Sequence, residues 1–344
     1  MGVYMKSIYG ITIDELEVFL KENNEKKYRA LQIMDWLYVK RVDSFSKMSN
    51  LSHELINLLE KNFFFDKLEI IKVLKDVDVS KFLFKLSDNN LIEAVLMNHD
   101  YGNSLCVSSQ VGCNMSCKFC ESGRLRKIRN LMASEMILQI LIIEKELKTR
   151  ISHVVVMGIG EPFDNFDNLV KFITIANYQK GINLGSRHIT VSTCGVVPKI
   201  YEFANLPFQV NLAISLHAPN NEIRDKIMPI NKIYKIEKLI KAVKDYIKIT
   251  NRRVTFEYIM LKDINDSLLN ARELAKLLKE INCYVNLIPY NETENIEFIR
   301  TEKEQILKFY DILKKEKINV TIRREFGSGI DAACGQLRAR EVMK

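Results

Sequence analysis

The sequence predicts an α/β protein built around a parallel β/α barrel or partial barrel, with a small helical module and a β-hairpin before it. Three observations support this prediction. From about residue 100, apolar runs of strand length alternate with amphipathic helical stretches, as is typical of parallel sheets. Residues 1–65 show helical periodicity, whereas between residues 68 and 97 the apolar period falls towards two. We therefore expect an N-terminal region over residues 1–98 and a barrel over residues 99–344.

The N-terminal region is predicted to contain three short helices. Apolar residues at helical spacing over residues 13–20 and 31–37 define the first two, and we expect Trp36 to lie in the core. Asn50 and Ser52 are suitable N-caps for the third helix. A small helical module of this kind is suited to docking on RNA, although its sequence carries no specific motif for that role.

The hairpin and the barrel follow in the chain. Turn-forming residues at 88–90 lie between two alternating runs and predict the hairpin. The barrel strands are predicted at residues 104–108, 153–157, 188–192, 210–215, 254–260, 284–289 and 319–323. Helices are predicted at residues 134–147, 236–249, 267–281 and 303–315. Active sites of parallel barrels lie at the C-terminal ends of the strands, so residues that directly follow these strands are candidates for function.

The composition is that of a soluble globular protein that works in a reducing compartment. Hydrophobic residues make up 47% of the 344 residues and charged residues 27%. No apolar run approaches the length needed to span a membrane, and the N-terminus has no signal-peptide pattern. The seven cysteines, an odd number with three of them clustered, indicate metal and redox chemistry in the cytoplasm. A net charge of +8 favours a polyanionic partner such as nucleic acid.

Three cysteines follow the first barrel strand: Cys113, Cys117 and Cys120, spaced C-x3-C-x2-C. Electron-transfer clusters and structural zinc sites both have four protein ligands. Three close thiols suit instead a cubane iron–sulfur cluster with one iron free, to which a small molecule can chelate. Two alternatives remain open here: Cys106 supplies a fourth zinc ligand, or the thiols are simply buried.

Other strand ends also carry candidate binding residues. Gly160 would let the backbone approach a ligand closely, and Glu161 could accept hydrogen bonds from a ligand ammonium. Hydroxyl and imidazole groups at the next strand ends suit contacts to a ribose or a carboxylate. This second set comprises Ser192, the run Ser215, Leu216 and His217, and Asn291 on the same rim. The alternatives are an ordinary strand-to-loop turn and a structural histidine.

A further thiol lies near the end of the chain. Cys334 stands between small residues in a predicted loop, in the run Ile330-Asp331-Ala332-Ala333-Cys334-Gly335-Gln336. Such a position favours an accessible thiol, and the alternative is a cysteine that only packs. Together with Cys106 it makes two thiols outside the triplet that could form a redox pair.

Several of these motifs together resemble one family. The segments CVSSQVGC, GEP, STCG, SLHAPN, MPIN, VNLIPYN and IDAACGQL, with the cysteine triplet, are similar to the RlmN family of radical S-adenosylmethionine (SAM) enzymes, dual-specificity adenine-C2 methyltransferases of 23S rRNA and tRNA. The resemblance covers essentially the whole chain. The sister family Cfr methylates adenine C8, but Val111 and Pro162 are more similar to RlmN. Cys194 departs from the family, which more often has serine there.

The resemblance implies a fold and a set of cofactors. The fold would be a partial (β/α)6 radical SAM barrel. One [4Fe-4S] cluster would bind to the cysteine triplet, and two SAM molecules would be used per turnover. A one-electron donor such as flavodoxin or ferredoxin would reduce the cluster. The residues implied in SAM binding are Gly160, Glu161, Ser192, Ser215, Leu216, His217 and Asn291.

The resemblance also implies a mechanism. Adenine C2 has no lone pair and cannot attack a methyl group directly, whereas a carbon radical can add to it. Cys334 would first take a methyl group from SAM, and the radical formed on that methyl would add to C2 of the adenosine. Cys106 would resolve the resulting RNA–protein crosslink through a disulfide with Cys334, and Glu93 would accept the C2 proton. The targets would be 23S rRNA in the peptidyl transferase centre and the adenosine 3′ of the tRNA anticodon.

Recognition of the RNA is expected to rest on phosphate contacts and on an extruded base. The candidate contacts are Arg124, Arg126, Lys127, Arg129, Arg323, Arg324, Arg338 and Arg340. We expect a cytoplasmic monomer with no membrane association. Two other functions are considered: a C8-directed methyltransferase, and a non-catalytic RNA-binding protein with a structural zinc ion, which would leave Cys334 and Glu161 without a role.

Overall fold

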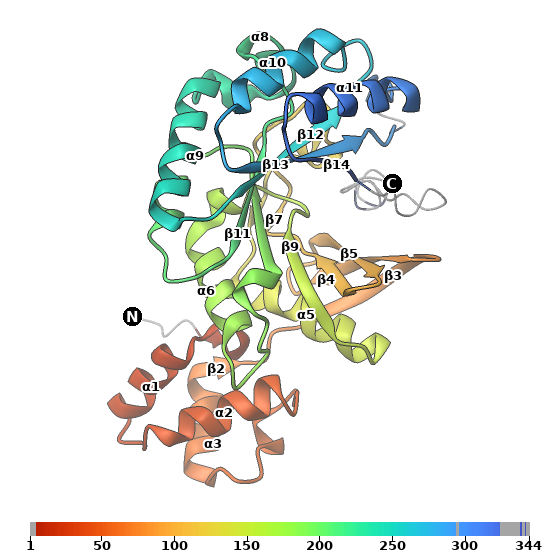
Figure 1. The fold of residues 1–344 in the computed structure, drawn as a ribbon. Coiled ribbons are helices and arrows are strands. Elements are labelled where there is room, and N and C mark those ends of the chain that lie inside the picture. The colour runs from red at the N-terminus through yellow and green to blue at the C-terminus, as the bar shows by residue number, and fades with distance from the viewer. Residues whose placement is uncertain (1–4, 294–295, 324–337, 339–340, 342–344) are drawn as a thin grey trace.

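The centre of the protein is a 10-stranded mixed sheet, seen in a computed structural model that describes residues 5–293 and 296–323, with Arg338 and Glu341 (Figure 1). Its parallel part runs through β6 (Gly102–Cys106), β9 (Ile151–Val156), β10 (Ile189–Thr193), β11 (Asn211–Ser215), β12 (Val254–Met260), β13 (Cys283–Pro289) and β14 (Val320–Ile322). Each predicted barrel strand is therefore present, with its ends moved by a few residues.

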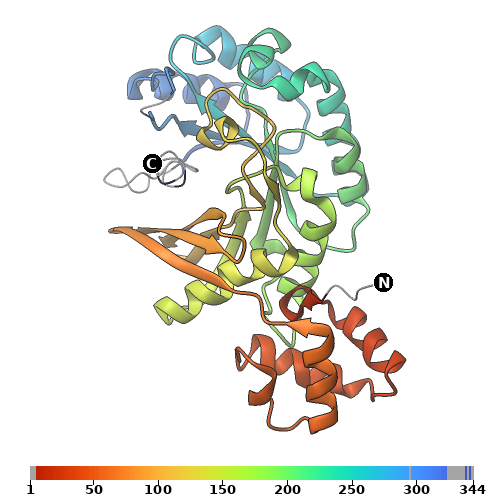
Figure 2. The same ribbon diagram turned by 180° about the vertical axis from the view of Figure 1, so that it is seen from behind.

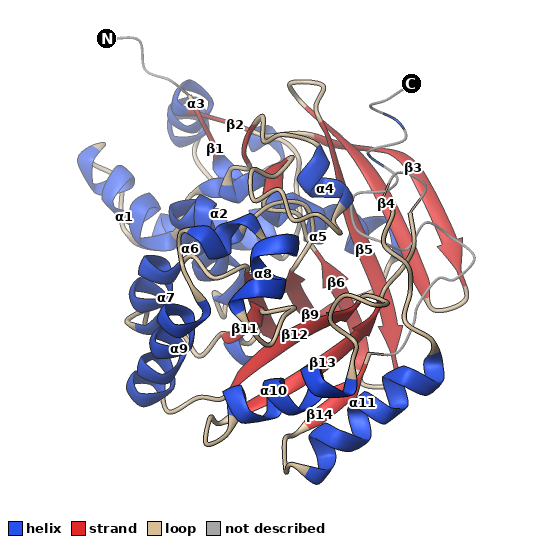
Figure 3. Ribbon diagram, turned by 90° about the horizontal axis from the view of Figure 1, so that it is seen from above, coloured by secondary structure: helices blue, strands red, loops and turns tan. Residues whose placement is uncertain are grey.

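Helices connect these strands and lie around the outside of the curved sheet (Figure 3). They are α5 (Ala133–Leu147), α6 (Phe166–Asn177), α7 (Val197–Ala204), α8 (Asn221–Ile227), α9 (Ile236–Thr250), α10 (Leu268–Leu278) and α11 (Lys303–Lys315). Within the described part of the chain, β14 and β3 are the two edges of the sheet and do not pair with each other. The barrel is therefore partial and open, as predicted for the radical SAM fold.

The predicted hairpin is part of a three-stranded antiparallel unit, β3 (Leu68–Asp76), β4 (Val79–Leu86) and β5 (Leu91–His99). The turn between β4 and β5 falls at residues 87–90, next to the predicted position, and β3 adds a strand that the sequence pattern did not separate. Strand β5 also pairs antiparallel with β6, where Val95 lies opposite Cys106. Side chains alternate along a strand, so Glu93 lies on the same face of β5 as Val95.

The N-terminal helices form as expected, as α1 (Ile13–Glu22), α2 (Tyr28–Tyr38) and α3 (His53–Asn62). Ser52 caps α3 by accepting from the backbone N–H of Leu55, whereas Asn50 accepts a hydrogen bond from the indole of Trp36 at 2.6 Å. Trp36 was expected in the core, but it lies partly exposed at the rim of the module. There the ammonium group of Lys40 sits over its ring, 3.6 Å from the centroid.

The helical module is fixed to one end of the barrel (Figure 2). Strands β1 (Lys6–Ser7) and β2 (Phe63–Phe64) pair beside it, and its apolar side chains belong to the same continuous core as those of the barrel. Arg41 in the module forms an ion pair with the buried Glu144 of α5. No helix in the described residues combines the length and the apolar character needed to cross a lipid bilayer.

Candidate active site

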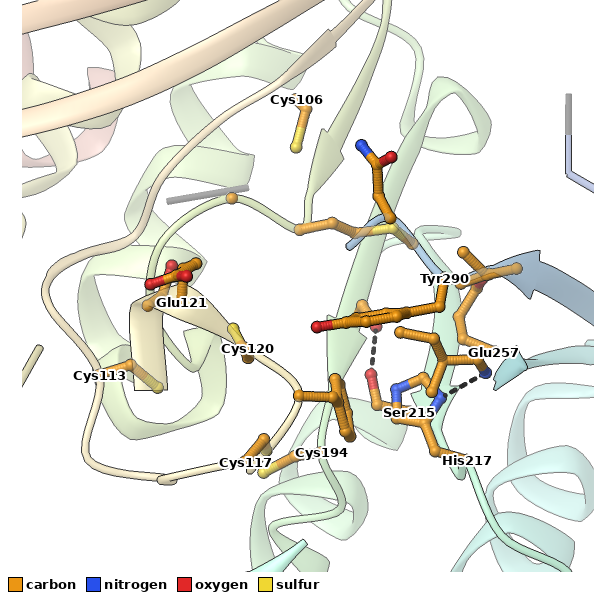
Figure 4. Close-up of a pocket in the computed structure, with 18 of the residues that line it drawn as sticks. Cys106, Cys113, Cys117, Cys120, Glu121, Cys194, Ser215, His217, Glu257 and Tyr290 are labelled. Carbon is orange, nitrogen blue, oxygen red and sulfur yellow. Dashed lines mark hydrogen bonds between the residues drawn. The ribbon is translucent and has the colours of Figure 1, made fainter. Parts of the chain in front are cut away.

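A cavity of about 400 Å³ opens at the C-terminal ends of the parallel strands (Figure 4). In Figure 4 the cysteine triplet lies on one side of the cavity, and Ser215, His217, Glu257 and Tyr290 lie on the other. The predicted site residues on its wall are Cys106, Cys113, Cys117, Cys120, Gly160, Glu161, Ser192, Ser215, His217 and Asn291. Leu216 is the exception among the predicted SAM contacts, because its side chain is buried in the apolar core. The sequence patterns thus converge on one place.

The cysteine triplet lies on a loop that is closed by its own backbone. Strands β7 (Gln110–Val111) and β8 (Arg129–Asn130) pair at its base, and α4 (Glu121–Arg124) follows the last cysteine. The N–H of Cys113 donates to the carbonyl of Leu125 at 3.0 Å. Gly112 has a φ of +81°, and a Cβ there would lie 2.2 Å from the carbonyl oxygen of Arg126. The loop can therefore close only with glycine at this position.

The three thiols fit a metal cluster better than a set of free cysteines. Burial raises the pKa of the Cys113 thiol to about 12 and raises the pKa values of Cys117 and Cys120, and the charge of Cys120 adds to the rise for both Cys113 and Cys117. Thiolates at this place therefore require a bound cation. Among the described residues, no three His, Cys, Asp or Glu side chains are placed to hold a single metal ion. Three cysteine ligands are one fewer than a structural zinc site has, and they suit an iron–sulfur cluster with one open iron.

The glycines after β9 bring two segments of the protein together. A Cβ at Gly158 would lie 2.6 Å from the carbonyl oxygen of Val107, and one at Gly160, where φ is +110°, would lie 2.6 Å from Cβ of Gln110. The side chain of Gln110 also accepts the N–H of Glu161 at 2.9 Å. These glycines therefore pack against the stem of the cysteine loop, and both also line the cavity, so the close approach to a ligand stays a prediction.

Glu161 is buried on the cavity wall and its carboxylate is held by backbone groups. It accepts from the N–H of Cys194 at 2.8 Å and from the N–H of Phe163 at 3.0 Å. Burial raises the pKa of this carboxyl, while the hydrogen bonds act in the opposite direction. Each carboxylate oxygen has a further lone pair that could accept from a ligand ammonium.

The next two strands contribute hydroxyl and imidazole groups. Ser192 and Ser215 lie side by side, with their hydroxyl oxygens 3.4 Å apart. His217 accepts the N–H of Ile259 at Nδ1 over 3.0 Å and stands edge-on to Phe119 of the cysteine loop. Burial, reinforced by a nearby arginine, lowers the pKa of His217 to about 3. The imidazole is therefore neutral, with its proton on Nε2 available as a donor.

Glu257 is a cavity residue that the sequence analysis did not identify. It lies on β12 between two strands with predicted site residues, and it accepts from the amide of Asn286 at 2.9 Å. Burial raises the pKa of the Glu257 carboxyl, and the positive charge of Arg323 opposes this shift. The alternation along β12 places Glu257 inward, but a single glutamate in an apolar strand gives no sign of its role.

Glu93, the predicted proton acceptor, is completely buried beside the cavity. Its carboxylate forms an ion pair with Lys81 of β4, with Nζ and Oε2 3.3 Å apart. The backbone N–H of Arg338 donates to the other carboxylate oxygen. The negative charge of Glu93 adds to the effect of burial in raising the pKa of the nearby Cys106 thiol. The sequence analysis did not identify Lys81 as part of the site.

Cys106 lies at the end of β6 on the cavity wall. Burial raises the pKa of its thiol to about 11, so it is protonated at neutral pH. Its predicted partner, Cys334, lies outside the described residues. The cysteines of the described part, Cys106 among them, are all free thiols.

Three of the eight basic residues predicted to contact RNA form ion pairs within the protein. Arg124 pairs with Glu121 at 3.3 Å, and Lys127 pairs with Asp164 at 2.6 Å. Arg129 binds two carboxylates, Asp88 and Glu135, and the second of these contacts is bidentate.

The other predicted RNA contacts lie in different surroundings. Arg126 is exposed on the cysteine loop, and Arg323 lines the cavity. Arg338 is buried beside Glu93. Arg324 and Arg340 lie outside the described residues.

The fold and the cysteine site together define the class of protein. Residues 107–275 match the model of the radical SAM superfamily. A solved structure, a radical SAM methyltransferase from Sphaerobacter thermophilus, is 40% identical with a TM-score of 0.91, and the match covers 98% of this chain and 100% of that one. The chain is a radical SAM protein, and this superfamily implies a [4Fe-4S] cluster and SAM. Cys113, Cys117 and Cys120 are the residues that would hold the cluster.

The N-terminal module narrows the assignment. Residues 6–64 match the ribosomal RNA large subunit methyltransferase N-terminal domain. A probable dual-specificity RNA methyltransferase RlmN from Acholeplasma laidlawii is 55% identical, over 97% of this chain and 99% of the relative. Proteins with the same description from Listeria welshimeri and Malacoplasma penetrans are 55% and 54% identical, over 98% and 99% of this chain and 95% and 98% of the relatives. The chain belongs to the RlmN family of radical SAM methyltransferases.

Proposed function

We propose that this protein methylates C2 of adenosine in RNA, with 23S rRNA and the anticodon loop of tRNA as its substrates. The observation that carries the proposal is a second thiol, Cys106, on the wall of the cavity that the cysteine triplet also lines. A radical SAM enzyme that only cleaves SAM has no need of this thiol. If Cys334 carries the methyl group, it becomes linked to the RNA, and a second thiol is needed to break that link.

Cys334, Cys106 and Glu93 would each have a separate role in the methyl transfer. When bound, the cluster and SAM supply the carbon radical that C2 requires. Cys334 carries the methyl carbon to the base, Cys106 frees the product by forming a disulfide with Cys334, and Glu93 accepts the C2 proton. The described residues that flank Cys334 support these roles, because Arg323 lines the cavity and the backbone of Arg338 binds Glu93.

The polar residues of the cavity would bind SAM. Glu161 is suited to accept from the methionine ammonium, and the paired hydroxyls of Ser192 and Ser215 are suited to a ribose or a carboxylate. His217 and Asn291 complete the same wall. An enzyme of this type uses two SAM molecules per turnover and a one-electron donor such as flavodoxin or ferredoxin. It would act as a monomer in the cytoplasm, where its ribosomal and transfer RNA substrates are found.

The proposal is tested by mass spectrometry of adenosine from a bacterial strain that lacks its own enzyme of this family. The strain is complemented with the wild type, with Cys334→Ala, with Cys106→Ala or with Cys283→Ala. Cys283 is a matched control, because it is a buried thiol on β13 that does not line the cavity. We expect 2-methyladenosine with the wild type and with the Cys283 variant only. A product of 8-methyladenosine would contradict C2 specificity, and modification by the Cys334 variant would contradict the methyl-carrier role.

A further inference from the structure

Arg224 is a completely buried arginine whose side chain joins three parts of the active site. It lies on α8, and Nε donates to the carbonyl of Leu216 at 3.1 Å. Nη2 donates to the carbonyl of Cys194 at 2.7 Å and to that of Ser215 at 3.3 Å. Nη1 donates to the amide oxygen of Asn231, in the segment MPIN, at 3.0 Å. One guanidinium thus holds the ends of β10 and β11 against the segment that follows α8.

The hydrogen bonds of Arg224 are satisfied, but its charge is not balanced by them. All four acceptors in the described residues are neutral carbonyl or amide oxygens. The neighbouring carboxylate, Asp225, already pairs with Lys235 at 2.6 Å and accepts from Asn231 at 2.8 Å. A fully buried cation is strongly unfavourable without a counter-charge. Its position therefore points to an anion that belongs to the working enzyme.

The cysteine loop lies directly beside the groups that bind Arg224. Cys194, whose carbonyl binds Arg224, packs in one small apolar cluster with Cys117 of the triplet. The N–H of Lys118, next in the chain, donates to the carbonyl of Ile227 at the end of α8, at 2.9 Å. In Figure 4 the side chains of Cys117 and Cys194 lie next to each other.

We infer that Arg224 is the built-in counter-charge of the iron–sulfur cluster and raises its reduction potential. The inference rests on the proposed function, because it requires a cluster on the three cysteines. Reduction of a cluster adds one negative charge, and a buried cation nearby stabilises the reduced form more than the oxidised form. Arg224 would thereby make electron transfer from a one-electron donor more favourable, without touching substrate.

The test is an anaerobic redox titration of the reconstituted cluster, followed by electron paramagnetic resonance. Arg224→Gln removes the charge and Arg224→Lys keeps it. Asn231→Ala is the matched control, since it removes one neutral acceptor of the same guanidinium. We expect the midpoint of the Gln variant to fall by about 59 mV or more, a tenfold lower ratio of reduced to oxidised cluster at a given potential. The Lys and Ala variants should stay close to the wild type.

An unchanged midpoint in a cluster-loaded Gln variant would overturn the inference and reduce Arg224 to a structural residue. Should that variant fail to fold, Asn231→Asp serves the same purpose, because it places a carboxylate beside Nη1 and neutralises the charge where it stands. A midpoint equal to that of Asn231→Ala would again reject the inference. Absence of any cluster from the wild type would instead contradict the proposed function itself.

Discussion

The substitution His217→Asn tests how the protein keeps an imidazole neutral in its active site. His217 has a φ of +58°, a conformation that asparagine tolerates better than other side chains do. The amide oxygen of asparagine can also replace Nδ1 as the acceptor of the N–H of Ile259. The variant should therefore keep the local backbone and its hydrogen bond, while losing the group that titrates.

The magnitude follows from the pKa of His217, which burial, helped by the charge of Arg224, lowers from 6.5 to about 3. Since the pKa in the folded state lies below that of the unfolded chain, protons bind the unfolded chain first as the pH falls. The native protein therefore loses stability from about pH 6.5 downwards. At pH 5, roughly 1.5 units below the pKa of the unfolded chain, protonation of His217 in the unfolded state lowers the free energy of unfolding by about 2 kcal/mol.

The assay is urea unfolding of both proteins, without cluster, at pH 8 and at pH 5. Loss of the edge-on contact with Phe119 will lower the free energy of unfolding of the variant at both pH values. The informative quantity is the loss between pH 8 and pH 5, which should be about 2 kcal/mol smaller in the variant. An equal loss in the two proteins would refute the assignment of a neutral, desolvated imidazole.

Two further predictions concern the surroundings of the cavity. Gly160→Ala should destabilise the protein by roughly 1–3 kcal/mol, because φ is +110° and the new Cβ would lie 2.6 Å from Cβ of Gln110. Gly185→Ala, where the nearest atom is 4.0 Å away, should unfold at nearly the wild-type urea concentration, and equal effects of the two changes would be contrary to this reasoning. Lys81→Met should cost about 3–5 kcal/mol by leaving Glu93 without its cation. The double variant with Glu93→Gln should recover most of that loss in the same urea assay, and full additivity would count against the ion pair.

The features predicted best from the sequence are the strands, the helices and the residues at strand ends, because these depend on the short-range pattern of apolar residues. The strand–helix alternation places the cysteine triplet after the first barrel strand, and this order follows directly from the short-range apolar period. The candidates that line the cavity were identified because they directly follow strands, and the ends of neighbouring parallel strands meet in space. Leu216 shows the limit of this rule, because alternation turns every second side chain into the core.

Residues whose partners are distant in sequence could not be predicted in this way. Arg224 lies in a polar helix and resembles a solvent-exposed residue, yet its acceptors come from two strands and from a later turn. Lys81 alternates with apolar residues on β4 and is buried only because β5 brings Glu93 opposite the same face. The ion pairs of Arg129 with Asp88 and Glu135 were not foreseen either, because they depend on the tertiary fold, and its contact with RNA stays a prediction.

The closure of the cysteine loop by its own backbone bears on how the enzyme matures. Small zinc domains depend on their metal to fold, because the ligands have no fixed arrangement without it. Here the pairing of β7 with β8, the bond from Cys113 to Leu125 and the bond from Lys118 to Ile227 shape the loop with protein groups alone. The sequence therefore meets two separate requirements here: these backbone contacts shape the loop, and the three cysteines supply the metal ligands.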